Sequence, residues 1–146
     1  MADHNIKRQV EIKAPIEKVF ELLTNPAKIP LVMPGLIENK NIPKLPLKKG
    51  DKFKYTYQMF GVMLEGIWTV TEIKSPSIYK AATNGDISSK WAYELVSKKG
   101  KTLVKFQTTY QLPKSVLSQV KATALKSMNE KEADHFMHNL KTALEM

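Results

Sequence analysis

The sequence contains no cysteine, and this absence removes several kinds of chemistry. Disulfides, thiolate metal ligands and cysteine nucleophiles are excluded throughout its 146 residues. There are three histidines, and the sequence shows neither a glycine-rich phosphate loop nor a serine nucleophile motif. We therefore expect no cofactor, no metal and no motif-defined catalytic residue.

Arginine is nearly absent as well, because Arg8 is the single arginine among 23 basic residues. Proteins that read nucleic acids depend on arginine for bidentate contacts, so the net charge of +9 does not predict a nucleic-acid partner. The lysines are spread along the chain, with a denser stretch from Lys40 to Lys54, which is typical of a solvated surface. The alternative is a transient contact with an anionic membrane surface or an acidic protein.

Long apolar runs are also missing. No run reaches transmembrane length, and residues 1–5 lack the apolar segment of a signal peptide, so we expect a cytoplasmic protein. The apolar content of 42% and charged content of 25% are ordinary for a globular chain. The length predicts one domain over residues 1–146 with a substantial core, but it predicts no oligomeric state.

Neither proline nor glycine follows Pro113, so the pattern predicts one helix from Pro113 to Met146. Such a helix of about 30 residues would be about 45 Å long. The first half of its apolar stripe is built from small or flexible side chains, which predicts a cavity beneath that half and tight packing beneath the second. The stripe consists of two runs at helical spacing: Leu117, Val120, Ala124 and Met128, then Ala133, Phe136, Met137, Leu140 and Leu144.

The preceding chain reads as strands with two short helical segments near the start. Residues 5–13 alternate as a half-buried strand, and short helices follow over residues 15–23 and 27–32. Six antiparallel strands are then expected, with hairpin turns at Asn84-Gly85 and Lys99-Gly100. They cover residues 36–42, 51–60, 62–74, 78–83, 87–97 and 102–112.

The strand over residues 62–74 contains two competing alternating sets. One set is Leu64, Trp68 and Val70, and the other is Met63, Ile67 and Ile73. A bulge near Gly66 would reconcile them.

The stretch VEIKAPIEKVFELLTNP (residues 10–26), together with this order of elements, resembles the START/Bet v 1-like (SRPBCC) superfamily, in particular its polyketide cyclase/dehydrase-like branch. The segments WTVTEI (68–73), KTLV (101–104) and NLKTALE (139–145) fit the same pattern. The turn MPGL (33–36) is similar to one in a subfamily named after a component of carbon monoxide dehydrogenase.

This resemblance implies an α+β helix-grip fold. In that fold a curved antiparallel sheet wraps around a long C-terminal helix, with two short helices after the first strand and a deep cavity between sheet and helix. Members bind lipids, sterols, hormones, polyketides or other apolar molecules, and a minority catalyse cyclisation or dehydration.

The strand faces that carry aromatic residues are the candidate cavity wall. Aromatic rings with polar tips suit an apolar ligand that carries one or two oxygens, while plain core packing is the alternative for each residue. The candidate ligand-binding residues, with those of the first half of the helix, are Tyr55, Tyr57, Trp68, Trp91, Tyr93, Phe106, Thr108, Tyr110, Leu117, Ala124 and Met128.

Arg8 is a further candidate, because it shares the parity of Ile6 and Val10 and so faces the concave side of the sheet. A guanidinium there could bind a ligand carboxylate or phenolate through two hydrogen bonds. The alternative is that Arg8 pairs with Glu65 or Glu94 and only holds the sheet together.

Two acidic positions invite a chemical interpretation. Glu65 lies among apolar residues and could be a buried acid with a raised pKa, or an exposed hairpin residue. Asp134, His135 and His138 cluster on the helix, but the only remaining histidine is His4, so no zinc site is predicted.

Two apolar loops, residues 60–64 and 29–34, would gate the cavity, since exposed apolar tips mark contact with a ligand, a partner or a membrane. Burial against the long helix is the alternative. The candidate gate residues are Phe60, Met63, Leu31 and Met33.

Three functions remain open. The first is the binding or transport of a small hydrophobic ligand in the cavity. The second is a cyclase/dehydrase-type enzyme that uses Arg8, Glu65 or a pocket tyrosine, for which we expect a polar pair within about 3 Å inside the cavity. The third is a protein-interaction module with a collapsed cavity, which would dock through residues 40–54.

Overall fold

The structure is a computed structural model that describes residues 4–111 and 113–146. Leu112, the predicted end of the last strand, lies outside the described residues. In chain order the elements are β1 (His4–Ile12), α1 (Ile16–Leu23), the 3-10 helix η1 (Ile29–Leu31), β2 (Leu36–Lys40), β3 (Lys52–Met59), β4 (Val62–Lys74), β5 (Ile78–Gly85), β6 (Ser89–Lys98), β7 (Lys101–Tyr110), α2 (Lys114–Leu117) and α3 (Ala122–Glu145).

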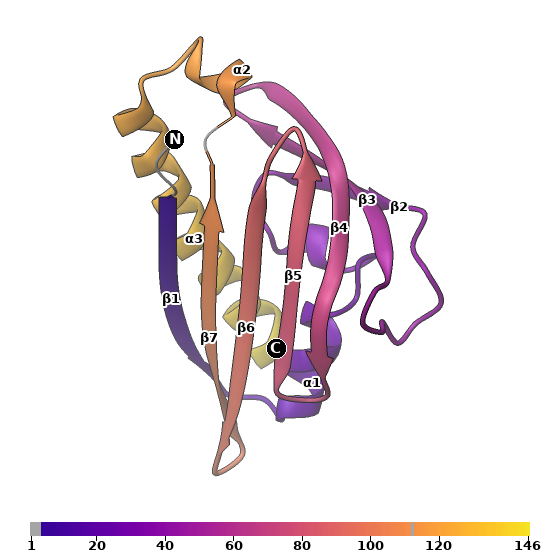
Figure 1. The fold of residues 1–146 in the computed structure, drawn as a ribbon. Helices are drawn as coiled ribbons and strands as arrows, with labels where there is room; N and C mark the ends of the chain where they lie inside the picture. Colours follow the sequence, from indigo (N-terminus) through magenta and orange to yellow (C-terminus); the bar gives the residue numbers. More distant parts are fainter. Residues whose placement is uncertain (1–3, 112) are drawn as a thin grey trace.

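The seven strands form one antiparallel sheet in the order β1-β7-β6-β5-β4-β3-β2. Strands β2 to β7 follow one another as a meander, and β1 pairs with β7 at the far edge. The sheet curves, and α1 and α3 both lie on its concave side (Figure 1), where α3 packs against β1. The predicted helix-grip fold is confirmed, whereas a single domain over residues 1–146 stays a prediction.

Alternation along the strands places the aromatic face on the concave side. Phe53, Tyr55 and Met59 of β3 are buried, while Lys52 and Lys54, on either side of Phe53, are exposed. The same period of two gives β7 a buried face of Thr102, Val104, Phe106, Thr108 and Tyr110. The predicted inward faces of these strands are therefore confirmed.

The competition within β4 is resolved in favour of Leu64 and Val70, which are both buried, while Met63 is exposed. The register shift lies between Val70 and Glu72, not near Gly66 as predicted. Gly66 serves close packing instead, since a Cβ there would lie 2.6 Å from the Tyr55 hydroxyl and closer still to the Asn84 carbonyl oxygen.

The turn predicted at Asn84-Gly85 is displaced. Both residues continue β5 and pair with Ile67 and Gly66 of β4, so the chain reverses over residues 86–88. The carboxylate of Asp86 accepts a hydrogen bond of 2.8 Å from the backbone N–H of Glu65, which holds this extension against β4.

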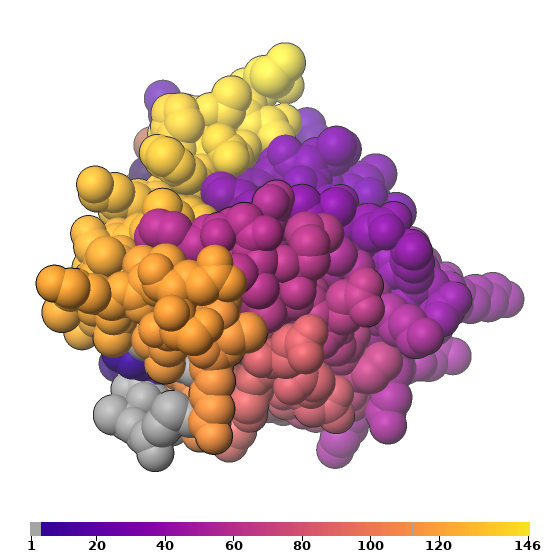
Figure 2. All heavy atoms as spheres, turned by 90° about the horizontal axis from the view of Figure 1, so that it is seen from above, coloured from indigo at the N-terminus to yellow at the C-terminus, as the bar shows by residue number. Residues whose placement is uncertain are grey.

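The C-terminal helix is shorter than predicted, because residues 118–121 separate α2 from α3. The Ser118 hydroxyl donates to the Ser115 carbonyl at 2.9 Å, a local bond of the kind that competes with helix continuation. Figure 2 shows residues 113–121, in orange, lying against magenta atoms at this end of the molecule, and Figure 1 identifies these as the upper end of β4.

The helical phase of the first apolar run was also predicted wrongly. Leu125 is fully buried, whereas Ala124 is exposed and Met128 is 36% exposed, so these two point away from the sheet. The polar Asn129 occupies a buried position in the stripe, and a pattern of apolar residues alone misses it. The second run is confirmed, since all five of its residues are buried.

Candidate functional site

A cavity of about 110 Å³ lies between the concave face of the sheet and the middle of α3. On the same measure a single buried water needs about 10–15 Å³, so the space admits a guest larger than water. α3 contributes Asn129, Glu132, Ala133 and Phe136 to the wall. The cavity thus lies beneath the middle of the helix, and the prediction that placed it beneath residues 117–128 was wrong, because Ala124 and Met128 face outward.

The floor of the cavity is a layer of rings on β3, β4, β6 and β7, which crosses β5 where Trp68 contacts Trp91. Phe53, Trp68, Trp91 and Phe106 follow one another with centroid separations of 6.0, 5.5 and 5.5 Å. Except for Arg8, every strand residue predicted for the wall lines this cavity: Tyr55, Tyr57, Trp68, Trp91, Tyr93, Phe106, Thr108 and Tyr110. Their binding of a ligand stays a prediction.

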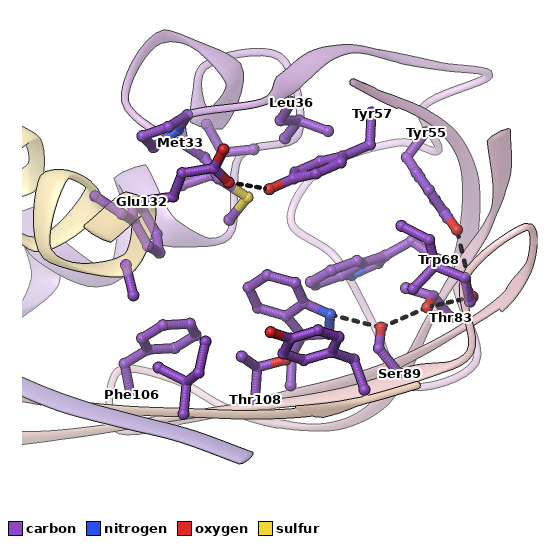
Figure 3. A pocket seen from close by; sticks show the side chains of 18 of the residues that line it. Met33, Leu36, Tyr55, Tyr57, Trp68, Thr83, Ser89, Phe106, Thr108 and Glu132 are labelled. Atoms are coloured by element: carbon purple, nitrogen blue, oxygen red, sulfur yellow. Dashed lines mark hydrogen bonds between the residues drawn. The ribbon is translucent and has the colours of Figure 1, made fainter. Parts of the chain in front are cut away.

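A polar pair crosses the cavity from sheet to helix. The Tyr57 hydroxyl of β3 donates to Oε2 of Glu132 on α3 at 2.8 Å (Figure 3). The Tyr57 ring lies over Gly35, where a Cβ would stand 2.6 Å from the ring carbon Cζ. Gly35 has a φ of +85° and accepts a hydrogen bond of 2.7 Å from the backbone N–H of Gln58. The turn before β2 therefore fixes the direction of the tyrosine.

Burial changes the acidity of both partners. It raises the pKa of the Glu132 carboxyl, although the hydrogen bond from Tyr57 and the nearby His135 act in the opposite direction. Burial and the neighbouring carboxyl raise the pKa of Tyr57 well above its usual range. Tyr57 therefore stays a hydrogen-bond donor, and Glu132 takes up a proton more readily than an exposed glutamate.

A second polar contact joins α3 to β7, where Asn129 Nδ2 donates to the Tyr110 hydroxyl at 2.8 Å. Burial raises the pKa of Tyr110, while the bond from Asn129 lowers it. Sequence reasoning missed Asn129 and Glu132. The available signal for Asn129 was its spacing, four residues from both Leu125 and Ala133.

The polar groups near the β5–β6 connection are occupied with one another. Trp91 Nε1 donates to the Ser89 hydroxyl at 2.8 Å, Ser89 and Thr83 share a bond of 2.5 Å, and Thr83 donates to the Ile87 carbonyl at 3.0 Å (Figure 3). Tyr55 donates in the same region to the Asn84 carbonyl at 3.3 Å. At this end of the cavity the polar side chains therefore bond to one another and to the backbone.

Two buried polar atoms of lining residues have no partner within the described residues: Asn39 Oδ1 and Thr108 Oγ1. Asn39 uses its amide N–H to bond the Pro26 carbonyl at 2.8 Å, so its oxygen remains free to accept. Unpaired buried polar atoms are costly.

Arg8 faces the concave side, as its parity predicted, but it is absent from the cavity lining. Its Nε donates to Asp134 Oδ1 at 2.6 Å. Because β1 is the edge strand beneath α3, the guanidinium meets the helix before it can reach the cavity. Neither Glu65 nor Glu94 is its partner in this ion pair, and Glu65 is exposed.

The other predicted positions lie off the cavity, with one exception. Met33 lines it, while Leu31 and Met63 are 82% and 52% exposed. Phe60 and Leu117 are partly buried against the core. The described residues contain no cluster of metal-ligating side chains, and none of their helices is long and apolar enough to cross a membrane.

Comparison with known proteins gives a family and a fold. The family profile described as "Polyketide cyclase / dehydrase and lipid transport" matches residues 3–145. No curated protein matches the sequence significantly.

Solved structures resemble the chain over nearly its whole length at low identity. The Zhui aromatase/cyclase from Streptomyces sp. R1128 superposes with a TM-score of 0.76 at 9% identity, covering 99% of this chain and 94% of that one. A START superfamily protein from Mycobacterium smegmatis gives 0.73 at 15%, with 97% of each chain covered, and Ara h 8.0201 gives 0.68 at 12%, with 98% of each. At such identities the likeness shows the fold alone.

Proposed function

Since the chain belongs to the polyketide cyclase/dehydrase and lipid transport family, we propose that it binds a small hydrophobic ligand in the cavity between the sheet and α3. The observation that carries this proposal is the cavity itself. It is a space of about 110 Å³ lined mainly by apolar and aromatic side chains in an otherwise packed core. Natural interiors rarely leave such a space without a use.

The arrangement of polar groups supports the same function. Most polar side chains in the wall are bonded to one another, so an apolar guest can fill the space without stranding them. Met33 and Pro34, in the turn after η1, line the cavity, and we propose this turn as the gate in place of the β3–β4 hairpin. The alternative function as a protein-interaction module assumed a collapsed cavity. The presence of a cavity therefore favours ligand binding over that alternative.

The test is a fluorescence titration with N-phenyl-1-naphthylamine, an uncharged apolar probe. Wild type should bind it with saturation, and Ala133→Phe should abolish binding by filling the cavity from α3. Ala124→Phe adds the same ring to the same helix at an exposed position and should bind like wild type. Equal binding by both variants, with folding verified by circular dichroism, would place the probe elsewhere and contradict the proposal.

The Tyr57–Glu132 pair supports a second candidate, a dehydratase acting on a ligand in the same cavity. The pair lies inside the cavity at 2.8 Å, the separation expected of an acid–base pair. In this scheme the Glu132 carboxylate removes the proton next to a ligand carbonyl. The hydroxyl on the next carbon then leaves with that proton as water, and a carbon–carbon double bond forms.

3-Hydroxy-1-tetralone is a suitable probe for this second candidate, because loss of one water yields 1-naphthol, which is fluorescent. Wild type should accelerate the loss of water, and Glu132→Gln should remove the acceleration while N-phenyl-1-naphthylamine still binds. A rate equal to that in buffer would exclude this probe reaction and leave ligand binding as the function.

A further inference from the structure

The charge of the cavity is opposite to that of the protein as a whole. The chain carries 23 lysines and arginines against 14 acidic residues. Among the described residues that line the cavity there is no lysine, arginine or histidine, and the single acidic side chain is Glu132. The cavity wall therefore has one carboxyl group and no basic group, while His135, which acts on Glu132 electrostatically, lies outside the lining.

This composition makes the binding of a negatively charged guest unfavourable. A carboxylate in the cavity would leave water, would find no basic partner, and would bring a second negative charge near Glu132 in a region of low dielectric constant. Binding would then require proton uptake by the guest or by Glu132, and that uptake costs free energy at neutral pH. An uncharged guest of the same size avoids this cost.

The free polar atoms favour a guest that donates hydrogen bonds. Asn39 Oδ1 can only accept. Glu132 accepts one bond from Tyr57 at Oε2, and an ionised carboxylate can accept several. Thr108 Oγ1, also free, can donate or accept.

These acceptors lie on different walls. Asn39 belongs to β2, at one edge of the sheet, Thr108 belongs to β7 near the other edge, and Glu132 projects from α3. The layer of rings formed by Phe53, Trp68, Trp91 and Phe106 lies on β3, β4, β6 and β7, so it reaches from the strand next to Asn39 to the strand of Thr108. A flat molecule could stack on these rings while its hydroxyls reach the walls.

We infer that the cavity selects uncharged, ring-containing ligands that carry hydroxyl groups, and that Glu132 makes it reject carboxylates, including free fatty acids. This inference rests on the proposed function and adds the chemical class of the ligand. It assigns Glu132 and Asn39 as residues that determine specificity.

The test compares two probes of nearly equal shape, 2-naphthalenemethanol and 2-naphthoate, by isothermal titration calorimetry near neutral pH. Wild type should bind the alcohol at least about tenfold more tightly than the carboxylate, a difference of about 1.4 kcal/mol. In Glu132→Gln the affinity for naphthoate should rise several-fold, and the preference for the alcohol over naphthoate should shrink accordingly. Asn39→Leu should weaken binding of the alcohol without helping naphthoate.

Glu130→Gln is the matched control, because it removes the same charge from the same helix at a position outside the cavity lining. It should keep the wild-type preference. If naphthoate binds wild type as tightly as the alcohol, or if the two glutamine variants behave alike, the inference is wrong although ligand binding stands. If neither probe binds any of the proteins, the proposed function fails as well.

Discussion

Gly35 shows how a missing side chain can position a polar group in the cavity. The Tyr57 ring occupies the space that a side chain at this position would take, and the tyrosine hydroxyl thereby reaches Glu132. The positive φ and the bond from Gln58 leave the turn little freedom to move aside. The identity of residue 35 therefore bears directly on the site.

Gly35→Ala should destabilise the protein more than Gly50→Ala does. Both glycines have positive φ, +85° and +92°, so both variants lose about 1–2 kcal/mol to backbone strain. Only at Gly35 would the new Cβ also clash, which adds about 1–3 kcal/mol and displaces Tyr57. Urea unfolding measures both values, and equal losses would show that Tyr57 is not held by this contact.

Glu132 should make stability depend on pH. Its folded pKa is raised above the ordinary 4.5, so the folded state binds the proton more tightly than the unfolded state. Its contribution is complete below that ordinary value and is lost as the pH rises through the folded pKa. Glu132→Gln should therefore gain stability relative to wild type as the pH rises from 4.5 through the folded pKa of Glu132, by less than about 1 kcal/mol because the carboxyl is partly solvated.

The groups near this carboxyl are Tyr57, Tyr110 and His135. His135 acts electrostatically on the Glu132 carboxyl, so His135→Gln is introduced into both wild type and Glu132→Gln before thermal unfolding is followed at each pH. The two tyrosines have raised pKa values and stay neutral throughout. A stability difference that does not change with pH would contradict the raised pKa.

The sequence predicted the residues of the sheet wall better than those of the helix wall. Alternation leaves each strand residue only two sides to face, and the aromatic side was evident for β3, β6 and β7. Glu132 was hidden because it falls within the polar residues that separate the two apolar runs of the helix. Its partner Tyr57 is 75 positions away, and no local pattern connects them.

At the scale of elements, α3 shows where periodicity is insufficient. Its second half was predicted correctly because the buried residues there are all apolar. In the first half the buried stripe passes through Asn129, which bonds Tyr110, and the apolar residues nearby gave a stripe of the wrong phase. The break at residues 118–121 was missed because neither proline nor glycine marks it.

The observed phase predicts the cost of truncating side chains along α3. Leu125→Ala should destabilise the protein by about 2–4 kcal/mol, because Leu125 is fully buried. Met128→Ala should change the free energy of unfolding by less than about 0.5 kcal/mol, because Met128 faces solvent. Denaturant unfolding of both variants checks this prediction. A larger loss of stability for Met128→Ala than for Leu125→Ala would mean that Met128, and not Leu125, faces the sheet.

At the scale of the whole molecule, the fold was predictable because its elements agree with one another. Short links between the strands favoured an antiparallel sheet with the helices on one face, and the resemblance to the START/Bet v 1-like superfamily implied the helix-grip arrangement. The existence of a cavity was predicted from small side chains on the helix, although its position depended on a phase that was wrong. The size and charge of the cavity could not be predicted, because they depend on how residues far apart in the sequence pack together.

Ligand binding should raise the stability of the whole molecule. A ligand at one hundred times its Kd adds about 2.7 kcal/mol, which corresponds to a rise in Tm of about 5–10 °C for a domain of this length. Differential scanning fluorimetry with 2-naphthalenemethanol should show this rise for wild type and Ala124→Phe. Ala133→Phe should show none, and a rise there would mean that the alcohol binds outside the cavity.

Both tryptophans of the chain, Trp68 and Trp91, stand in the cavity wall. All of the protein's indole emission thus originates beside the space where a guest would sit, and none comes from a distant surface. Displacement of water from the cavity should move that emission to shorter wavelength. The unlabelled protein consequently carries its own optical sensor of occupancy, suitable for screening compound collections without any added dye.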